Sequence, residues 1–188
     1  MRTPSAYEQQ LGRYIRRQFG QATKVIRYGD DHGTRDMFLV IGEDCPQAGI
    51  TSFGTVGLSQ RAQQVGAQKM HVELLGACAS GPHFDNVMAS CVFDSFHNHS
   101  NIVYGAFIEN ILDQYQISTT LRHVTFVAPF FWQGLSPQTI EGIEIHWLLV
   151  VPISDAELDM LKKQGIEKLE NLFEQKQIDL FDMHRASL

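Results

Sequence analysis

The stretch HWLLVVPISDAELDMLKKQG, residues 146–165, decides how the fold is read. Its first half is a nearly continuous apolar run that ends at Pro152, which is typical of a strand buried on both faces. In its second half, Ser154 and Glu157 have the S-x-x-E spacing of a capping box, in which each side chain accepts a backbone N–H at the start of a helix. The stretch therefore predicts a central strand that turns directly into a helix.

This turn could be a catalytic elbow or a structural corner. An acid–base role would need a second titratable group aimed at the same point, and the sequence identifies none. Capping contributes about 1 kcal/mol by itself, and Asp155 lies where the helix dipole favours a negative charge. We therefore interpret Ser154 and Glu157 as structural capping residues.

Outward from this corner, the rest of the chain divides into helices and strands. Apolar residues at helical spacing predict helices over residues 5–19, 83–96, 154–164 and 166–175, with Pro82 just before the second. Apolar runs between turn residues predict strands over residues 23–28, 37–42, 52–59, 70–78, 121–129 and 144–152. Residues 101–119 favour a short strand followed by either a loop or a helical turn. The expected class is α/β, a central mixed β-sheet flanked by helices.

Size, cysteine content and charge limit the possible functions. No linker divides residues 1–188, so we expect one domain, and no run approaches the roughly 20 apolar residues of a membrane-spanning helix. The N-terminus lacks the apolar core of a secretory signal, and three cysteines without a CxxC pair fit a reducing cytoplasm. The net charge of −6 disfavours direct nucleic-acid binding and suits a basic protein partner.

Histidines and cysteines are the obvious candidates for chemistry, but their setting favours other roles. His97 and His99 stand two residues apart, a spacing that separates them on a helix, so we expect them at a helix end and not in a metal site. Cys78 and Cys91 lie among apolar residues and are expected to behave as small core residues. We therefore predict no catalytic residues, no metal and no cofactor.

Three consecutive aromatic residues, Phe130, Phe131 and Trp132, enter a loop rich in glycine and proline. Consecutive side chains cannot all face one core. The loop could fold back over the sheet edge, or it could present an anchor for a protein partner, because such residues are enriched in binding hot spots. Both interpretations stay open, and the three rings are the candidate partner-binding residues.

Taken together, these segments resemble the suppressor of fused domain family, particularly its single-domain bacterial members. Residues 145–188 resemble the C-terminal signature of that family: a Trp-containing strand, a Pro-Ile-Ser turn, an acidic helix, a Leu/Phe helix and an Asp-Leu tail with a basic residue, here Arg185. TVGLS (residues 55–59) is similar to an early strand of the family, and VTFVAPFFW (residues 124–132) to its strand ending in Pro-Phe.

The resemblance implies an α/β sandwich and a binding module without catalysis. Bacterial members look like immunity proteins of polymorphic toxin systems, which bind and neutralise a cognate toxin, often a nuclease. Our leading hypothesis is therefore a cytoplasmic immunity protein whose partner is a basic toxin domain. One alternative is a hydrolase that uses His97, His99 or His123 with a carboxylate such as Asp94; another is a regulatory scaffold that sequesters a cellular protein.

Overall fold

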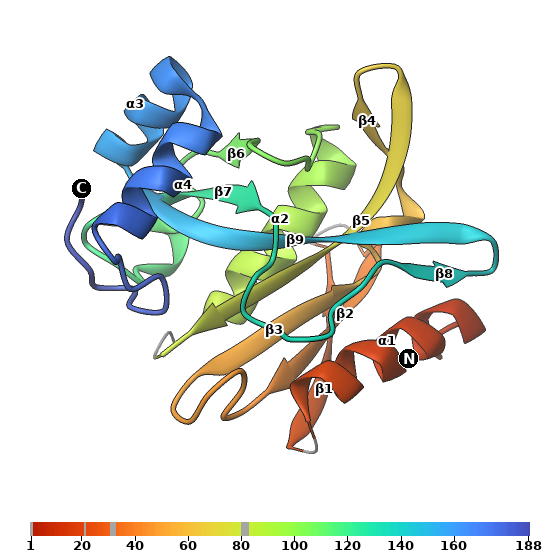
Figure 1. Cartoon of the computed structure of the whole chain (residues 1–188). Coiled ribbons are helices and arrows are strands. Elements are labelled where there is room, and N and C mark those ends of the chain that lie inside the picture. Colours follow the sequence, from red (N-terminus) through yellow and green to blue (C-terminus); the bar gives the residue numbers. More distant parts are fainter. Residues whose placement is uncertain (1, 21, 31–32, 80–82) are drawn as a thin grey trace.

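One mixed β-sheet organises the fold in the computed structural model, which describes residues 2–20, 22–30, 33–79 and 83–188 (Figure 1). The strands are β1 Thr23–Gly29, β2 Asp36–Gly42, β3 Thr51–Val56, β4 Gln63–Val65, β5 Gln68–Cys78, β6 Phe107–Ile108, β7 Leu121–Val127, β8 Gln138–Ile140 and β9 Ile143–Ser154. The main order is β1-β2-β3-β5-β9-β7-β6, with β4 beside β5 and β8 beside β9. Among the described strands only the β5–β9 pairing is parallel. The predicted α/β class with a mixed sheet is confirmed.

Helix α1, Ala6–Phe19, packs closely on one face of the sheet. It starts with a capping box between Ser5 and Glu8, as the sequence pattern of the segment allows. The helix approaches β2 and β3 where both strands carry glycine. A Cβ atom on Gly54 would lie 2.7 Å from Cγ2 of Ile15, and one on Gly42 would lie 2.6 Å from Cβ of Phe19. These glycines let the backbones of helix and sheet come together.

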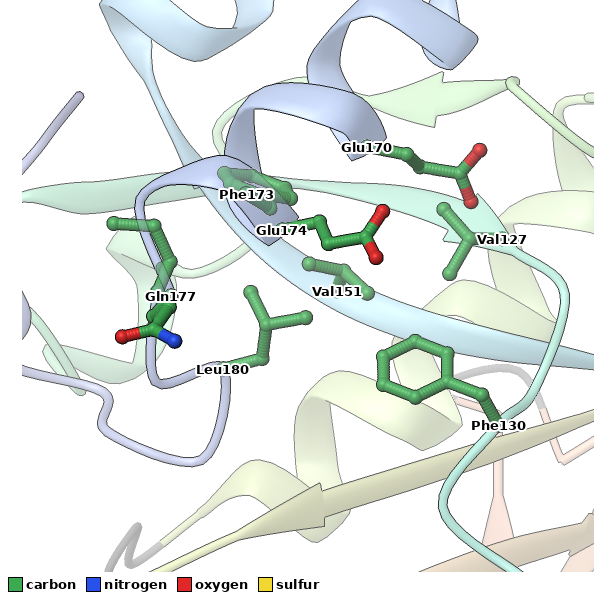
Figure 2. A pocket seen from close by; sticks show the side chains of 9 residues that line it. Val127, Phe130, Val151, Glu170, Phe173, Glu174, Gln177 and Leu180 are labelled. Carbon is green, nitrogen blue, oxygen red and sulfur yellow. The ribbon is translucent and has the colours of Figure 1, made fainter.

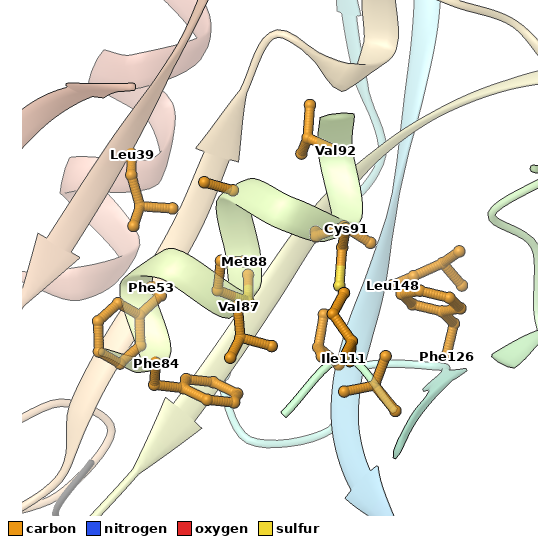
Figure 3. Packing of buried hydrophobic residues seen from close by; sticks show 14 of the residues in the cluster. Leu39, Phe53, Phe84, Val87, Met88, Cys91, Val92, Ile111, Phe126 and Leu148 are labelled. Atoms are coloured by element: carbon orange, nitrogen blue, oxygen red, sulfur yellow. The ribbon is translucent and has the colours of Figure 1, made fainter. Parts of the chain in front are cut away.

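Helix α2, Phe84–His97, covers the opposite face. Figure 3 shows Phe84, Val87, Met88 and Cys91 of this helix among buried side chains of several strands. Phe84 meets Phe53 edge to face, with ring centroids 5.5 Å apart. The helix begins and ends within one residue of the expected 83–96, whereas Pro82, expected just before it, lies outside the described residues.

Helices α3, Asp155–Gln164, and α4, Ile166–Gln175, follow β9 directly and lie on the same face as α1. Gly165 joins them with a φ of 85°, a conformation that glycine adopts without strain. Residues 176–188 contain no helix or strand and form a C-terminal tail, in which the carbonyl oxygen of Phe181 accepts the backbone N–H of Ala79, just after β5. Burial of β9 on both faces is thereby explained, since helices cover each side.

The sequence patterns do not predict two short strands, β4 and β8, each three residues long, and β3 ends at Val56 before a 3-10 helix at Leu58–Gln60 instead of running to Ser59. In residues 101–119, where a short strand followed by a loop or a helical turn is expected, the structure has β6 and then, after a turn, a 3-10 helix at Asp113–Tyr115. Within the described ranges, no helix is long and apolar enough to cross a membrane.

Candidate partner-binding site

The loop after β7 places its three consecutive aromatic rings in three different environments. Trp132 is 7% exposed, and its indole Nε1 donates a hydrogen bond to Oγ of Ser52 over 3.1 Å. Phe131 is partly buried, and its ring centroid lies 4.3 Å from that of Phe181 in the C-terminal tail. Phe130 is 61% exposed. Trp132 and Phe131 therefore hold the loop in place, and Phe130 alone of the three presents its ring to the solvent.

An apolar groove of about 410 Å³ opens beside Phe130, between the loop after β7, helix α4 and the tail (Figure 2). Its apolar walls come from Val127, Phe130, Val151, Phe173, Ile178 and Leu180. Its polar lining comes from Glu170, Glu174 and Gln177. We call this set of residues the Phe130 groove. Its members come from β7, β9, α4 and the tail, which the sheet topology brings together.

The wall formed by the tail is fixed by a buried ion pair. The guanidinium of Arg185 donates to both carboxylate oxygens of Glu157, over 2.6 and 2.8 Å, and to the carbonyl oxygen of Pro152 over 3.0 Å. It also lies over the ring of Phe173, 5.2 Å from the centroid. Both ionic side chains are almost fully buried, 6% and 0% exposed. Arg185 therefore ties the tail to helix α3 and packs on Phe173, one of the residues that line the groove.

The capping residues of α3 take part in the same attachment. The backbone N–H of Ser154 donates to Glu157, and the Ser154 hydroxyl accepts from the Glu157 backbone, which completes a capping box. Glu157 also accepts the backbone N–H of Leu188, and the Ser154 hydroxyl is 2.7 Å from that of Ser187. The corner at Ser154 is thus structural in geometry, and it also fixes the end of the chain.

Two carboxylates of helix α4 lie at the opening of the groove. Glu170 accepts a hydrogen bond from the hydroxyl of Tyr104, a residue that is 45% exposed. Partial burial and this carboxylate raise the pKa of Tyr104 to about 12, so the phenol stays protonated and continues to donate. Glu174 lies one helical turn beyond Glu170 and faces the same opening (Figure 2). Among the groove residues, the charged ones are both acidic.

Two of the histidines that could serve a hydrolase, His97 and His123, each contact a different carboxylate. Nε2 of His97 is 3.0 Å from Oδ2 of Asp30. His123 is 2% exposed; its Nδ1 accepts the backbone N–H of Asn110 and its Nε2 is 2.9 Å from Oδ1 of Asp155. Those contacts require the neutral Nε2–H tautomer, which leaves His123 no free nitrogen for a substrate. In the described residues, no three His, Cys, Asp or Glu side chains come close enough to hold a metal ion.

The cysteines have the properties of core residues. All three are buried and unpaired. Burial raises the pKa of the Cys78 thiol to about 12, and that of Cys91 is raised for the same reason. A thiol held protonated is a poor nucleophile. The remaining candidates for a hydrolase site are His99 and Asp94. His99 is exposed beyond the end of α2, and the Asp94 carboxylate accepts a hydrogen bond from the Asn98 side chain.

Comparison with known proteins agrees with this architecture. The family model of suppressor of fused protein (SUFU) matches residues 33–186. The chain belongs to the suppressor of fused family. Among curated proteins it is similar to the immunity protein YqcF of Bacillus subtilis (strain 168), with 32% identity over 182 residues and 95% of each chain covered.

Solved structures of the suppressor of fused family share the fold. A SUFU homologue from Neisseria gonorrhoeae FA 1090 matches with a TM-score of 0.67 at 19% identity, covering 96% of each chain. A chain of the Sufu–Fu complex matches with a TM-score of 0.60 at 13% identity, over 98% of this chain and 93% of that one. Drosophila Suppressor of Fused matches with a TM-score of 0.57 at 13% identity, over 87% of this chain but 42% of its own length. The names of the family and of the curated relative point to binding of proteins and away from catalysis.

Most of the residues that line the groove could not be predicted from the sequence. Phe130 was found because three aromatic residues in a row cannot share one core. Val127, Val151 and Leu180 have no such signal, since they read as ordinary members of a strand or tail. Glu170 and Glu174 read as the solvated face of an amphipathic helix. The only available hint was that they are i,i+4 neighbours of the same charge.

Proposed function

We propose that this protein is an immunity protein: a non-catalytic binding domain that attaches to a cognate toxin domain in the cytoplasm and blocks it. The observation that carries the proposal is the end-to-end similarity to an immunity protein, 32% identity with 95% of both chains covered. The exposed Phe130 beside an apolar groove supports it, because such surfaces mark protein contacts. Three buried thiols are compatible with a reducing compartment.

The toxin is expected to carry a basic surface, and a nuclease domain is the first class to test. Net charge −6 on the immunity protein would attract such a surface, which must itself be basic to hold nucleic acid. Binding over the toxin's active surface would then exclude its substrate without any chemistry by this protein.

The test is capture of the partner from native cells with a tagged copy of this chain. Co-purifying proteins are identified by mass spectrometry, and the complex is checked by size exclusion. We expect one stoichiometric partner with a toxin-like domain, whose expression arrests growth unless this protein is present. A stoichiometric partner that is harmless when expressed alone would instead support a regulatory scaffold, and the immunity proposal would be abandoned.

A further inference from the structure

The Phe130 groove carries two carboxylates of the same helix: Glu170 accepts a hydrogen bond from Tyr104, whereas Glu174 is poorly accommodated in the protein alone. Glu170 and Glu174 are i,i+4 neighbours on α4, and like charges at this spacing destabilise a helix. Glu174 is also the second-to-last residue of α4, where the helix dipole disfavours a negative charge, and the last turn has no basic residue. Within the described part of the chain, the Glu174 carboxylate makes no ion pair or side-chain hydrogen bond.

The apolar walls restrict what could cover this site. A purely apolar occupant would bury the Phe130 ring but would also remove water from the two carboxylates, and a desolvated charge without a partner is costly. An occupant with its own cation avoids this cost and replaces the water with an ion pair. The volume, about 410 Å³, is at the small end of ligand pockets and fits a few side chains.

From this geometry we infer that the Phe130 groove is the docking site for a basic-apolar segment of the partner protein, in which an apolar side chain enters the groove and an adjacent Arg or Lys pairs with Glu174 and Glu170. This inference deepens the proposed function and rests on it. Tyr104 extends the same surface, since its hydroxyl donates to Glu170 and the residue is 45% exposed.

A variant at Glu174 should stabilise the free protein and at the same time weaken its binding to the partner. Glu174→Lys removes the like-charge pair and places a cation at the helix C-terminus, so the thermal midpoint of the free protein should rise. The same change should raise the dissociation rate of the purified partner domain by about tenfold or more, because it sets like charges against each other. A residue that only stabilised α4 would not show this opposition.

Phe130→Ala tests the apolar half of the site. Phe130 is 61% exposed, so folding should be unaffected, while the dissociation rate should rise about tenfold or more. Two matched control positions lie near the opposite edge of the sheet, in β1 and just after β2. Val25→Ala removes an exposed apolar side chain from β1, and Glu43→Lys makes the same change in total charge at a side chain that is 66% exposed. Both controls should leave the dissociation rate within about twofold.

Two results separate this inference from the proposed function. If the toxin binds the wild-type protein and Phe130→Ala and Glu174→Lys dissociate like the controls, the groove is not the docking site, although the immunity role stands. If no toxin binds, the immunity role fails and the groove is tested alone by NMR with the probe N-acetyl-Leu-Arg-Leu-Arg-amide. Amide shifts at Val127, Phe130 and Val151 that the Leu-Glu analogue does not cause would support the groove; equal or absent shifts would overturn it.

Discussion

Arg185 is a single buried side chain on which much of the folding stability is expected to depend. Its pairing with Glu157 is almost fully shielded from water. Removing one partner of such a pair leaves the other charge buried without compensation. We expect Arg185→Met to lower the free energy of unfolding by about 3–5 kcal/mol, measured by urea denaturation.

Two further variants identify the cause of that loss. Arg122→Met breaks exposed ion pairs with Asp113 and Asp155, and it should lower the free energy of unfolding far less than Arg185→Met. Adding Glu157→Gln to Arg185→Met removes the orphaned charge and should recover part of the stability. A double variant as unstable as Arg185→Met, or more so, would show that lost contacts of the tail, and not the unpaired carboxylate, cause the effect.

Asp30 makes the stability depend on pH. Its carboxylate accepts from the hydroxyl and backbone N–H of Thr34 and the backbone N–H of Arg35, and it contacts His97. The Thr34 hydrogen bond first, and then the others, hold the pKa of Asp30 well below its usual 3.8. Because the folded pKa is lowered, this stabilisation is complete above pH 3.8 and is lost as the pH falls below it.

Urea denaturation between pH 7 and pH 3 should therefore show a loss of stability below about pH 4 that Asp30→Asn reduces. Asp44→Asn is the control, since this exposed carboxylate is hydrogen-bonded in a separate turn to Gly49. Parallel curves for wild type and Asp30→Asn would contradict the assignment.

At the scale of elements, close contact between α1 and the sheet depends on glycine. A methyl group on Gly54 would overlap Ile15, whereas one on Gly12, in the helix itself, would meet nothing within 4 Å. We expect Gly54→Ala to destabilise the protein by about 1–3 kcal/mol through overpacking. Gly12→Ala should instead stabilise it by about 0.5–1 kcal/mol through helix propensity. Opposite signs in urea denaturation are the required result; a loss at both positions would mean that α1 tolerates no added volume.

The longer elements could be predicted because each carries its own local signal. α4 was expected at residues 166–175 and lies at Ile166–Gln175, since glycine precedes it and its apolar residues keep a helical period. β4 and β8 could not be predicted, because three residues are too few to show a period. They form through pairing with longer strands. The parallel β5–β9 pairing joins residues 74 positions apart, such as His71 and Ile145, and likewise leaves no local pattern.

At the scale of the whole molecule, the candidate site is a product of topology. Phe130 and Phe173 reach one groove only because β7 and β9 are neighbours in the sheet and α4 returns over them. The family resemblance predicts the fold and a protein-binding role from the sequence, but it does not predict which residues form the interface. That interface depends on which side chains remain exposed after packing, and exposure is a property of the folded chain. The burial of Trp132 and exposure of Phe130, two residues apart, show the difference.

The total charge of −6 is also a property of the whole molecule, and we expect it to affect mainly the rate of association with a partner. Attraction between an acidic and a basic protein speeds their encounter, and salt screens it over about 10 Å at 0.1 M. We expect the association rate with a basic toxin domain to fall by about tenfold or more between roughly 0.05 M and 0.5 M NaCl, while the dissociation rate changes little.

Stopped-flow association kinetics can separate this long-range effect from local pairing. Glu43→Lys and Glu174→Lys change the total charge equally, so both should slow association at low salt and differ little at high salt. Only Glu174→Lys should also speed dissociation, because only that carboxylate lies in the Phe130 groove. An association rate independent of salt would remove charge steering from this account, and binding would then depend on the apolar groove and its local ion pairs alone.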